Sequence, residues 1–426
     1  MSKNLPILFK HYKKLNGKVP WISILTNIPT PIDRLRSLEN HFDNFQGEIY
    51  IKRDDKCHNL YGGNKLRKFE FIFAYIKKKR KAVMTFGGIG TNHGMACAII
   101  SKMFNLKCHL FLIHQPLTWH VQRYLLLFDY FGAKLHYSKG YGSIGLKALF
   151  FKLFHPKSFL ILPGGSVIFG RGNPLGVVGF INAAFELKEQ IDEGKIPKPD
   201  VIFVAGGTGG TAAGLIAGIK LSNLRIDVFI VCVTDEMAIN PKAIRTNANK
   251  ALHYLQKMDA TVPKIEVQEK DFKIIYGFLG SGYGVKTKKS QDAIDLIMEL
   301  ECRNRGFKLD TTYTGKTMAA MLDFIQNSEN SRKKILFWNT YNSNDLGIYL
   351  KEGKFDYKRL PKKFHRFFES QEFQCWQIKD CPNNIKLKCN SYLNDEYRCW
   401  LVKNCLKENK MNCECFKVLN KAIDYE

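Results

Sequence analysis

Apolar and polar residues follow a regular alternation of patterns along the first 350 residues. Short runs rich in branched and aromatic side chains, such as residues 48–52 and 201–205, are typical of strands. Between such runs, apolar residues recur at helical spacing, as in residues 91–104. The same patterns predict further strands at 82–86, 107–113, 135–137 and 159–162, and further helices at 119–131, 144–154 and 174–190. Strands and helices that alternate in this way predict an α/β fold built on parallel sheets.

The composition is that of a globular protein, with 45% hydrophobic and 24% charged residues among 426. A chain of this length can bury the cores of two or three domains. Its first 18 residues alternate lysines with short apolar pieces, and no run of about 18 apolar residues occurs. We therefore expect a cytoplasmic protein with no membrane partner. The formal charge of +26 is spread along the chain, which favours a lysine-rich surface over nucleic-acid binding.

A lysine follows two glycines at the start of a predicted helix, in Gly62-Gly63-Asn64-Lys65. The glycines allow a tight turn, and Lys65 then falls in the first helical turn. The positive end of the helix, the neighbouring cations Arg67 and Lys68, and any burial all lower the pKa of the Lys65 amine. A neutral amine of this kind suits Schiff-base chemistry. A solvated basic helix start is the alternative for this motif alone.

A second glycine-rich segment follows the apolar strand predicted at 201–205 and leads directly into a helix. Free backbone N–H groups and a helix N-terminus together favour phosphate binding. No Lys-Ser or Lys-Thr pair follows, so the P-loop pattern is absent, and the spacing does not match a dinucleotide site. The segment fits one isolated phosphate monoester, with a ligand-free tight turn as the alternative. The residues expected to hold the phosphate are Gly207, Thr208, Gly209, Gly210 and Thr211.

A lysine nucleophile and a monophosphate site together describe pyridoxal 5′-phosphate. From about Thr30 to about Asn339 the chain resembles the fold type II pyridoxal enzymes of the D-cysteine desulfhydrase and 1-aminocyclopropane-1-carboxylate (ACC) deaminase family. The resemblance implies a tryptophan-synthase-β-like α/β fold with two three-layer αβα domains. Residues 1–67 with 179–350 would form the larger, cofactor-binding domain, and residues 68–178 the smaller one. We also expect a homodimer that acts on a small amino acid.

The resemblance assigns roles to four residues near the cofactor. Lys65 would carry the cofactor through its amine, and Lys68 would lie on the phosphate side. The loop Gly90-Thr91-Asn92-His93 resembles the family segment in which the asparagine contacts the pyridoxal hydroxyl group. Asn92 would therefore bind the cofactor, and Thr91 would face the substrate. Most family members have serine where this chain has Thr91.

Two tyrosine segments also resemble the family. Tyr283 lies between glycines, and Tyr313 precedes Thr314-Gly315-Lys316. The tyrosines would lie near the substrate, where either could protonate a leaving group, and Thr314 would lie at the pyridine nitrogen. A neutral hydroxyl at this nitrogen suits α,β-elimination, because the carbanion is relieved at once by loss of a β-substituent.

We therefore predict a lyase that resembles D-cysteine desulfhydrase and converts D-cysteine to pyruvate, sulfide and ammonia. ACC deaminase is the first alternative, although that branch typically has glutamate at the position of Thr314. A racemase or another deaminase is a further alternative. A catalytically silent protein that binds pyridoxal phosphate and carries a metal-binding interaction module is the alternative from another functional class.

The C-terminus has a different character from the rest of the chain. After a lysine- and phenylalanine-rich linker at residues 351–373, residues 374–426 contain an internal repeat with a period of 24 residues. This Cys-rich segment resembles a small bacterial module with two Cys-Trp pairs. Grouped thiols in a reducing compartment favour zinc or iron–sulfur binding, with a flexible thiol-bearing tail as the alternative. The expected ligands are Cys375, Cys381, Cys389, Cys399, Cys405, Cys413 and Cys415.

Overall fold

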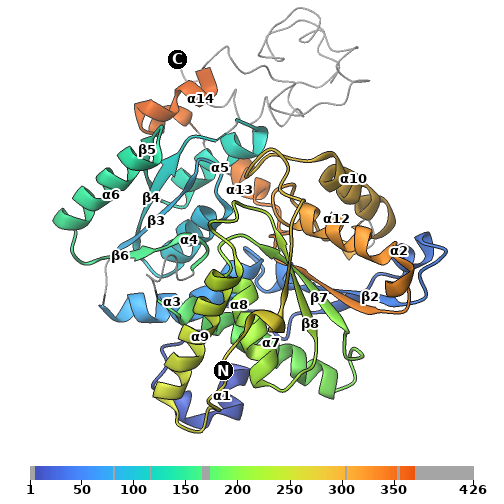
Figure 1. Cartoon of the computed structure of the whole chain (residues 1–426). Helices are drawn as coiled ribbons and strands as arrows, with labels where there is room; N and C mark the ends of the chain where they lie inside the picture. Colours follow the sequence, from blue (N-terminus) through green and yellow to red (C-terminus); the bar gives the residue numbers. More distant parts are fainter. Residues whose placement is uncertain are drawn as a thin grey trace, which may run out of the picture. The chain divides into compact units, whose positions relative to one another are not determined.

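The computed structural model describes residues 5–79, 82–115, 117–165, 173–302, 305–352 and 356–369 (Figure 1). The cysteines expected to bind metal, from Cys375 to Cys415, lie outside these residues. Two compact units make up the chain. Unit 1 holds the described residues of Met1–Lys78 and Leu162–Asn344, and unit 2 holds those of Lys79–Ile161 and Asp345–Glu426.

Unit 1 is built on a six-stranded sheet in the order β1-β2-β10-β7-β8-β9. Only the β1–β2 pair is antiparallel, and every other neighbouring pair is parallel. Strands that are distant in sequence pair directly, since Glu48 of β2 lies opposite Lys334 of β10. The strands are β1 (Ile32–Arg34), β2 (Glu48–Arg53), β7 (Val201–Gly206), β8 (Asp227–Cys232), β9 (Lys273–Ile275) and β10 (Lys334–Asn339).

Helices cover both faces of this sheet. In Figure 1, α10 and α12 lie on one side of β7 and β8, and α7, α8 and α9 lie on the other. The α-helices of unit 1 are α1 (Ile7–His11), α2 (Arg36–His41), α3 (Asn64–Lys79), α7 (Leu175–Asp192), α8 (Gly210–Leu221), α9 (Pro241–Met258), α10 (Lys288–Ile297) and α12 (Thr314–Ile325). Shorter turns are η1 (Lys13–Leu15), η2 (Asp54–Lys56), η3 (Pro163–Gly165), η4 (Glu269–Asp271), the π-helical η5 (Met298–Cys302) and η6 (Ser328–Asn330).

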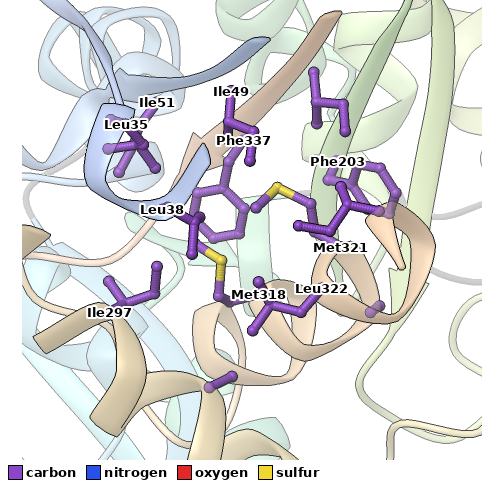
Figure 2. Packing of buried hydrophobic residues seen from close by; sticks show 14 of the residues in the cluster. Leu35, Leu38, Ile49, Ile51, Phe203, Ile297, Met318, Met321, Leu322 and Phe337 are labelled. Carbon is purple, nitrogen blue, oxygen red and sulfur yellow. The ribbon is translucent and has the colours of Figure 1, made fainter. Parts of the chain in front are cut away.

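The alternation of side chains along the strands divides the core of unit 1 between the two faces of the sheet. Figure 2 shows Phe203 and Phe337 packed against Met318 and Met321 of α12. The next residue of β10, Trp338, contacts Phe180 of α7, with ring centroids 6.1 Å apart. A sheet buried on both sides in this way explains why its central strands are continuously apolar.

Unit 2 is built on a four-stranded parallel sheet in the order β5-β4-β3-β6. Helix α6 packs on one face, where Ile144 and Ala148 meet Met84 and Phe111. Helix α4 contacts β3 and β4. The elements of unit 2 are β3 (Ala82–Gly88), α4 (Asn92–Met103), β4 (Lys107–Ile113), α5 (Trp119–Tyr130), β5 (Lys134–Ser138), α6 (Tyr141–Phe154), β6 (Ser158–Ile161), α13 (Gly347–Glu352), η7 (Tyr357–Arg359), η8 (Lys362–Phe364) and α14 (Arg366–Glu369).

The α/β prediction with parallel sheets and helical layers is therefore confirmed. Residues 356–369, which belong to the predicted linker, are part of unit 2. Phe364 and Phe367 are buried, and Nε2 of Gln122 donates a hydrogen bond of 2.7 Å to the backbone oxygen of Phe367. Among the helices that the structure describes, none is long and apolar enough to cross a bilayer.

Candidate active site

The turn before α3 depends on its two glycines. A Cβ at Gly62 would lie 1.8 Å from the backbone oxygen of Asp55, and Gly63 has a φ of +97°. The backbone N–H of Gly62 donates to Asn342 at 2.7 Å, and that of Asn64 donates to the oxygen of Thr340 at 3.2 Å. This close fit to the end of β10 fixes where α3 begins, and it places Lys65 in the first helical turn.

Lys65 is half-buried, and its Nζ lies 5.4 Å from the ring centroid of Tyr313. Burial lowers the pKa of its amine to about 8, against a smaller opposing effect of the Asp310 carboxylate. About a tenth of the amine is therefore neutral at pH 7, far more than for an ordinary lysine. This is the protonation state that a lysine nucleophile requires.

Arg67 does not contribute to this pKa in the way the sequence suggested. Its guanidinium group is buried and donates to Asp54 at 2.7 Å and to Glu186 at 2.9 Å. Lys52 donates to the same Glu186 carboxylate at 2.6 Å. These carboxylates compensate the charge of Arg67, so burial, rather than repulsion from Arg67, lowers the pKa of Lys65.

The glycine-rich loop connects β7 to α8 within unit 1. Gly209 has a φ of +77° and is the residue immediately before α8, so residues 207–211 surround the N-terminus of that helix. A Cβ at Gly207 would lie 3.2 Å from Cε1 of Tyr313, which places this glycine directly against the tyrosine ring. The ring of Tyr313 thus contacts the loop and also lies near the Lys65 amine.

Asn64 connects the two helix N-termini. Its Nδ2 donates a hydrogen bond of 3.0 Å to Oγ1 of Thr211, in the first turn of α8. Its Oδ1 is buried and has no hydrogen-bond partner among the described residues. The sequence reasoning missed this role of Asn64, although the residue belongs to the glycine–lysine motif. The contact holds the lysine and the glycine-rich loop in a fixed relationship.

Tyr283 and Tyr313 form a hydrogen bond between their hydroxyl groups. Tyr283 comes from an exposed loop and has 54% of its surface accessible, whereas burial raises the pKa of Tyr313 well above 10. Tyr313 therefore stays protonated at neutral pH. The pair places a neutral phenol next to Lys65.

Asp310 is a second residue that the sequence reasoning missed. Its carboxylate accepts from the backbone N–H groups of Tyr313 at 3.1 Å and Thr314 at 2.9 Å, at the start of α12. It also accepts a hydrogen bond of 2.7 Å from the hydroxyl of Thr314, which is fully buried. An acidic residue shortly before a helix N-terminus is the signal that could have identified it.

Lys68 lies one helical turn after Lys65 and is 2% exposed. Burial and the nearby Lys65 lower the pKa of its amine to about 7. Its Nζ donates to the backbone oxygen of Gly164 at 2.7 Å. An amine with this pKa gains a proton readily when an anion binds close to it.

Thr91 and Asn92 lie in unit 2, after the carboxyl end of β3. Thr91 is the N-cap of α4, and its Oγ1 accepts from the backbone N–H of Gly94 at 3.2 Å. The Oδ1 of Asn92 accepts from the hydroxyl of Tyr124 at 2.9 Å. The other site residues expected from the sequence, except the tail cysteines, all lie in unit 1.

Pyridoxal phosphate fits the residues that unit 1 brings together. Lys65 supplies an amine with a lowered pKa, and the loop at α8 supplies backbone N–H groups at a helix N-terminus. The buried Oδ1 of Asn64, which has no partner among the residues that the structure describes, leaves hydrogen-bonding capacity between them. In the parts of the chain that the structure describes, no group of three or more His, Cys, Asp or Glu residues could hold a metal ion.

Most of the chain is similar to known proteins. Residues 24–340 match the family model described as pyridoxal-phosphate dependent enzyme. A D-cysteine desulfhydrase of Salmonella schwarzengrund is 31% identical over 341 residues, covering 76% of this chain and 95% of its own length. A putative 1-aminocyclopropane-1-carboxylate deaminase of Thermotoga maritima is 29% identical over 319 residues, covering 73% of this chain and 93% of its own.

A solved structure, that of an ACC deaminase homologue, superposes with a TM-score of 0.63 at 25% identity. It covers 85% of this chain and 99% of its own. These matches confirm the prediction of a pyridoxal-phosphate-dependent lyase with the type II fold. The chain belongs to the family of pyridoxal-phosphate dependent enzymes.

Proposed function

We propose that this protein catalyses α,β-elimination from a small amino acid, with D-cysteine as the substrate that gives pyruvate, sulfide and ammonia. One observation carries the proposal. The Lys65 amine has a pKa of about 8 and lies near the ring of Tyr313, which itself contacts the glycine-rich loop. The D-cysteine desulfhydrase of Salmonella schwarzengrund, at 31% identity, supports this choice of reaction.

The site residues of unit 1 each have a defined role in this proposal. Residues 207–211 hold the phosphate group, and Lys68 adds a positive charge on the phosphate side. When bound, pyridoxal phosphate supplies an electron sink for the Cα of the substrate. Lys65 binds the cofactor through its amine and, as a neutral amine, takes the Cα proton. A base with a pKa near the working pH is efficient in such a transfer.

The tyrosine pair suits the leaving group. Departure of the β-sulfur requires a proton on the thiolate or a donor that stabilises it. Tyr313 keeps its proton because burial raises its pKa, and its hydroxyl is hydrogen-bonded to Tyr283. Tyr313 is therefore the proposed donor, and Tyr283 would orient its hydroxyl. Asn92 and Thr91 remain the proposed contacts from unit 2 to the cofactor and to the substrate carboxylate.

ACC deamination is the second candidate, and the similarity to the ACC deaminase homologue favours it. The two reactions differ at the pyridine nitrogen. Thr314 is neutral and donates its hydroxyl proton to Asp310, so it brings no negative charge of its own to that position. We expect this position to favour elimination from a substrate that has a Cα hydrogen, which ACC lacks.

The test is a substrate screen on the purified protein loaded with pyridoxal phosphate. Pyruvate and sulfide are measured from D-cysteine and L-cysteine, and 2-oxobutanoate is measured from ACC. We expect turnover of D-cysteine that Lys65→Ala abolishes, together with loss of the near-visible absorbance band of the lysine-bound cofactor. Turnover of ACC with D-cysteine inert would establish the second candidate instead. If borohydride treatment still fixes the cofactor covalently to the Lys65→Ala protein, Lys65 does not have this role.

We also propose that residues 374–426 form a separate module that binds zinc or an iron–sulfur cluster. The support is the 24-residue repeat of its cysteines, because thiolates are the ligands these metals prefer. Elemental analysis of the full chain, purified without oxygen, should find bound metal. Substitution of Cys375, Cys381, Cys399 and Cys405 by serine should remove the metal and leave the cofactor band unchanged. A metal-free full chain supplied with both metals would refute the module.

A further inference from the structure

Helix α6 of unit 2 exposes a continuous apolar stripe. Its inward face packs on the sheet through Ile144 and Ala148. Five other apolar side chains remain between 57% and 80% exposed, and they recur at the helical spacing i, i+3, i+4, i+7 and i+8. They are Leu146, Leu149, Phe150, Leu153 and Phe154. We call these five residues the α6 stripe. A helix that is apolar on its outer face as well as its inner one is typical of a buried element.

The charged groups of α6 do not cover this stripe. The amine of Lys147 donates to the backbone oxygen of Tyr137 at 2.6 Å. The amine of Lys152 donates to the backbone oxygens of Pro156, at 3.1 Å, and Ser158. Both ammonium groups therefore point to carbonyls of unit 2. The sequence of α6 contains no acidic residue, so the stripe carries no charge pair of its own.

The exposed area of the stripe is at the upper end of what a monomer usually leaves in water. Five leucine and phenylalanine side chains, each more than half exposed, present on the order of 600 Å² of apolar surface. The largest patch on a typical monomer is about 300–600 Å². Two copies joined through this stripe would bury about 1,200 Å² in total, which reaches the range of stable protein interfaces.

We infer that α6 packs against α6 of a second copy of this chain, around a two-fold axis. A two-fold interface requires the same patch on both partners. The stripe meets this need, because Leu146, Phe150 and Phe154 form one ridge at four-residue spacing and Leu149 and Leu153 form the next. Ridges and grooves with this spacing are those through which helices commonly pack. The inference gives the expected homodimer a specific interface and does not depend on the reaction proposed for the site.

The contacts of the lysines favour a protein partner over a lipid surface. A helix that lies on an anionic membrane directs its lysine amines toward the lipid headgroups. In α6 the amines of Lys147 and Lys152 are instead bound to backbone oxygens. A second copy presents an equally apolar stripe, so packing against it requires no contact with these amines.

The test uses the full chain loaded with cofactor and measures its mass in solution by sedimentation. We expect the wild-type protein to be a dimer, and we expect Phe150→Glu with Leu153→Glu to raise the dimer dissociation constant about 100-fold or more, because the charges would be buried in the interface. Met103→Glu is the matched control. Met103 is an exposed apolar residue of unit 2 outside the stripe, at 45% accessible surface, and its variant should stay dimeric.

A photo-crosslinking amino acid at position 150 of the otherwise unchanged chain identifies what covers the stripe, even if the double variant fails to fold. A link between two chains, with α6 peptides on both sides, is the expected result. A monomeric wild-type protein, a dimer that survives the double substitution, or a link to residues 370–426 of the same chain would overturn the inference. So would binding to phosphatidylserine vesicles that the double substitution abolishes.

Discussion

The hydroxyl group of Thr314 is held by two groups of Asp310. It donates to Oδ1 of Asp310 at 2.7 Å and accepts from the backbone N–H of the same residue at 2.8 Å. The only proton of this hydroxyl is thus given to Asp310. Toward any third group, Thr314 has a lone pair and no proton. The same carboxylate partly opposes the lowering of the Lys65 pKa by burial. One acidic residue therefore influences two groups of the candidate site.

Replacement of Asp310 by asparagine should lower the pKa of Lys65 further. The Asp310 carboxylate favours the protonated amine, and its loss leaves burial unopposed.

The rate at which the apoprotein takes up pyridoxal phosphate depends on the fraction of the Lys65 amine that is neutral. Plotted against pH, this rate should rise with a midpoint near pH 8 in the wild-type protein. In the variant the midpoint should lie at a lower pH. At about pH 6.5 the variant should therefore load faster than the wild type. Asp292→Asn, at an exposed carboxylate of α10, is the control. An unchanged or higher midpoint in Asp310→Asn would contradict the assignment.

Replacement of Lys68 by glutamine should weaken pyridoxal-phosphate binding. A charge-assisted hydrogen bond is worth about 1.5–3 kcal/mol, so the dissociation constant should rise about tenfold or more. Lys68 loses its proton as the pH rises through about 7 in the free protein. The difference in dissociation constant between the wild type and the variant should therefore become smaller as the pH rises from about 6 to about 8. Absorbance titration of the apoprotein measures both effects.

The control for Lys68 is Lys78→Gln, because Lys78 is an exposed lysine on the same helix. Its dissociation constant should equal that of the wild type at every pH. Equal weakening in both variants would mean that general charge, rather than the position of Lys68, attracts the phosphate group.

Replacement of Gly209 by alanine should impair both stability and phosphate binding. The φ of +77° disfavours any side chain, and a Cβ would lie 2.7 Å from Cδ1 of Ile244. We expect a loss of about 1–2 kcal/mol in the free energy of unfolding, measured in urea. We also expect weaker binding of pyridoxal phosphate, because the N–H groups of the loop would shift.

Gly194→Ala separates these two effects. Gly194 has a φ of +69°, yet a Cβ there meets nothing within 4 Å, and the residue lies outside the glycine-rich loop. Its variant should lose similar stability and keep the wild-type affinity for the cofactor. If Gly209→Ala also keeps that affinity, the loop does not hold the phosphate group.

Glu70 is a buried acid whose ionisation weakens the fold. Burial raises its pKa to about 7, although its Oε1 accepts from the backbone N–H groups of Ile24 and Leu25. The folded state thus binds a proton more tightly than the unfolded state. Its favourable contribution is present below the unfolded pKa of about 4.5 and is lost as the pH rises through about 7.

Glu70→Gln keeps the accepting oxygen and removes this ionisation. At about pH 8 the variant should therefore be more stable than the wild type by about 2–3 kcal/mol, with the two converging near pH 4. Urea unfolding at several pH values measures the difference. A variant less stable than the wild type at pH 8 would show that the ionised form has a favourable partner.

The sequence predicted individual elements far better than their neighbours in space. Strand 107–113 was predicted with the bounds that β4 has, because its signal is local. Nothing local indicates that Glu48 pairs with Lys334, since that contact depends on which strands share a sheet. The site shows the same division. Lys65 was identified from adjacent residues, whereas Glu186, which compensates the charge of Arg67, lies 119 positions away.

The place of β2 between β1 and β10 in the unit 1 sheet has a consequence for how the chain folds during synthesis. All four strands of unit 2 lie between Ala82 and Ile161, so its sheet is complete in sequence early in translation. β2 emerges before them, yet its parallel partner β10 begins only at Lys334. At a synthesis rate of about 5–20 residues per second, roughly 15–60 seconds pass between the synthesis of β2 and that of β10. During this time the edge of β2 that later pairs with β10 stays open. Among the described strands, the short antiparallel strand β1 is the only sheet partner available to β2 during that interval.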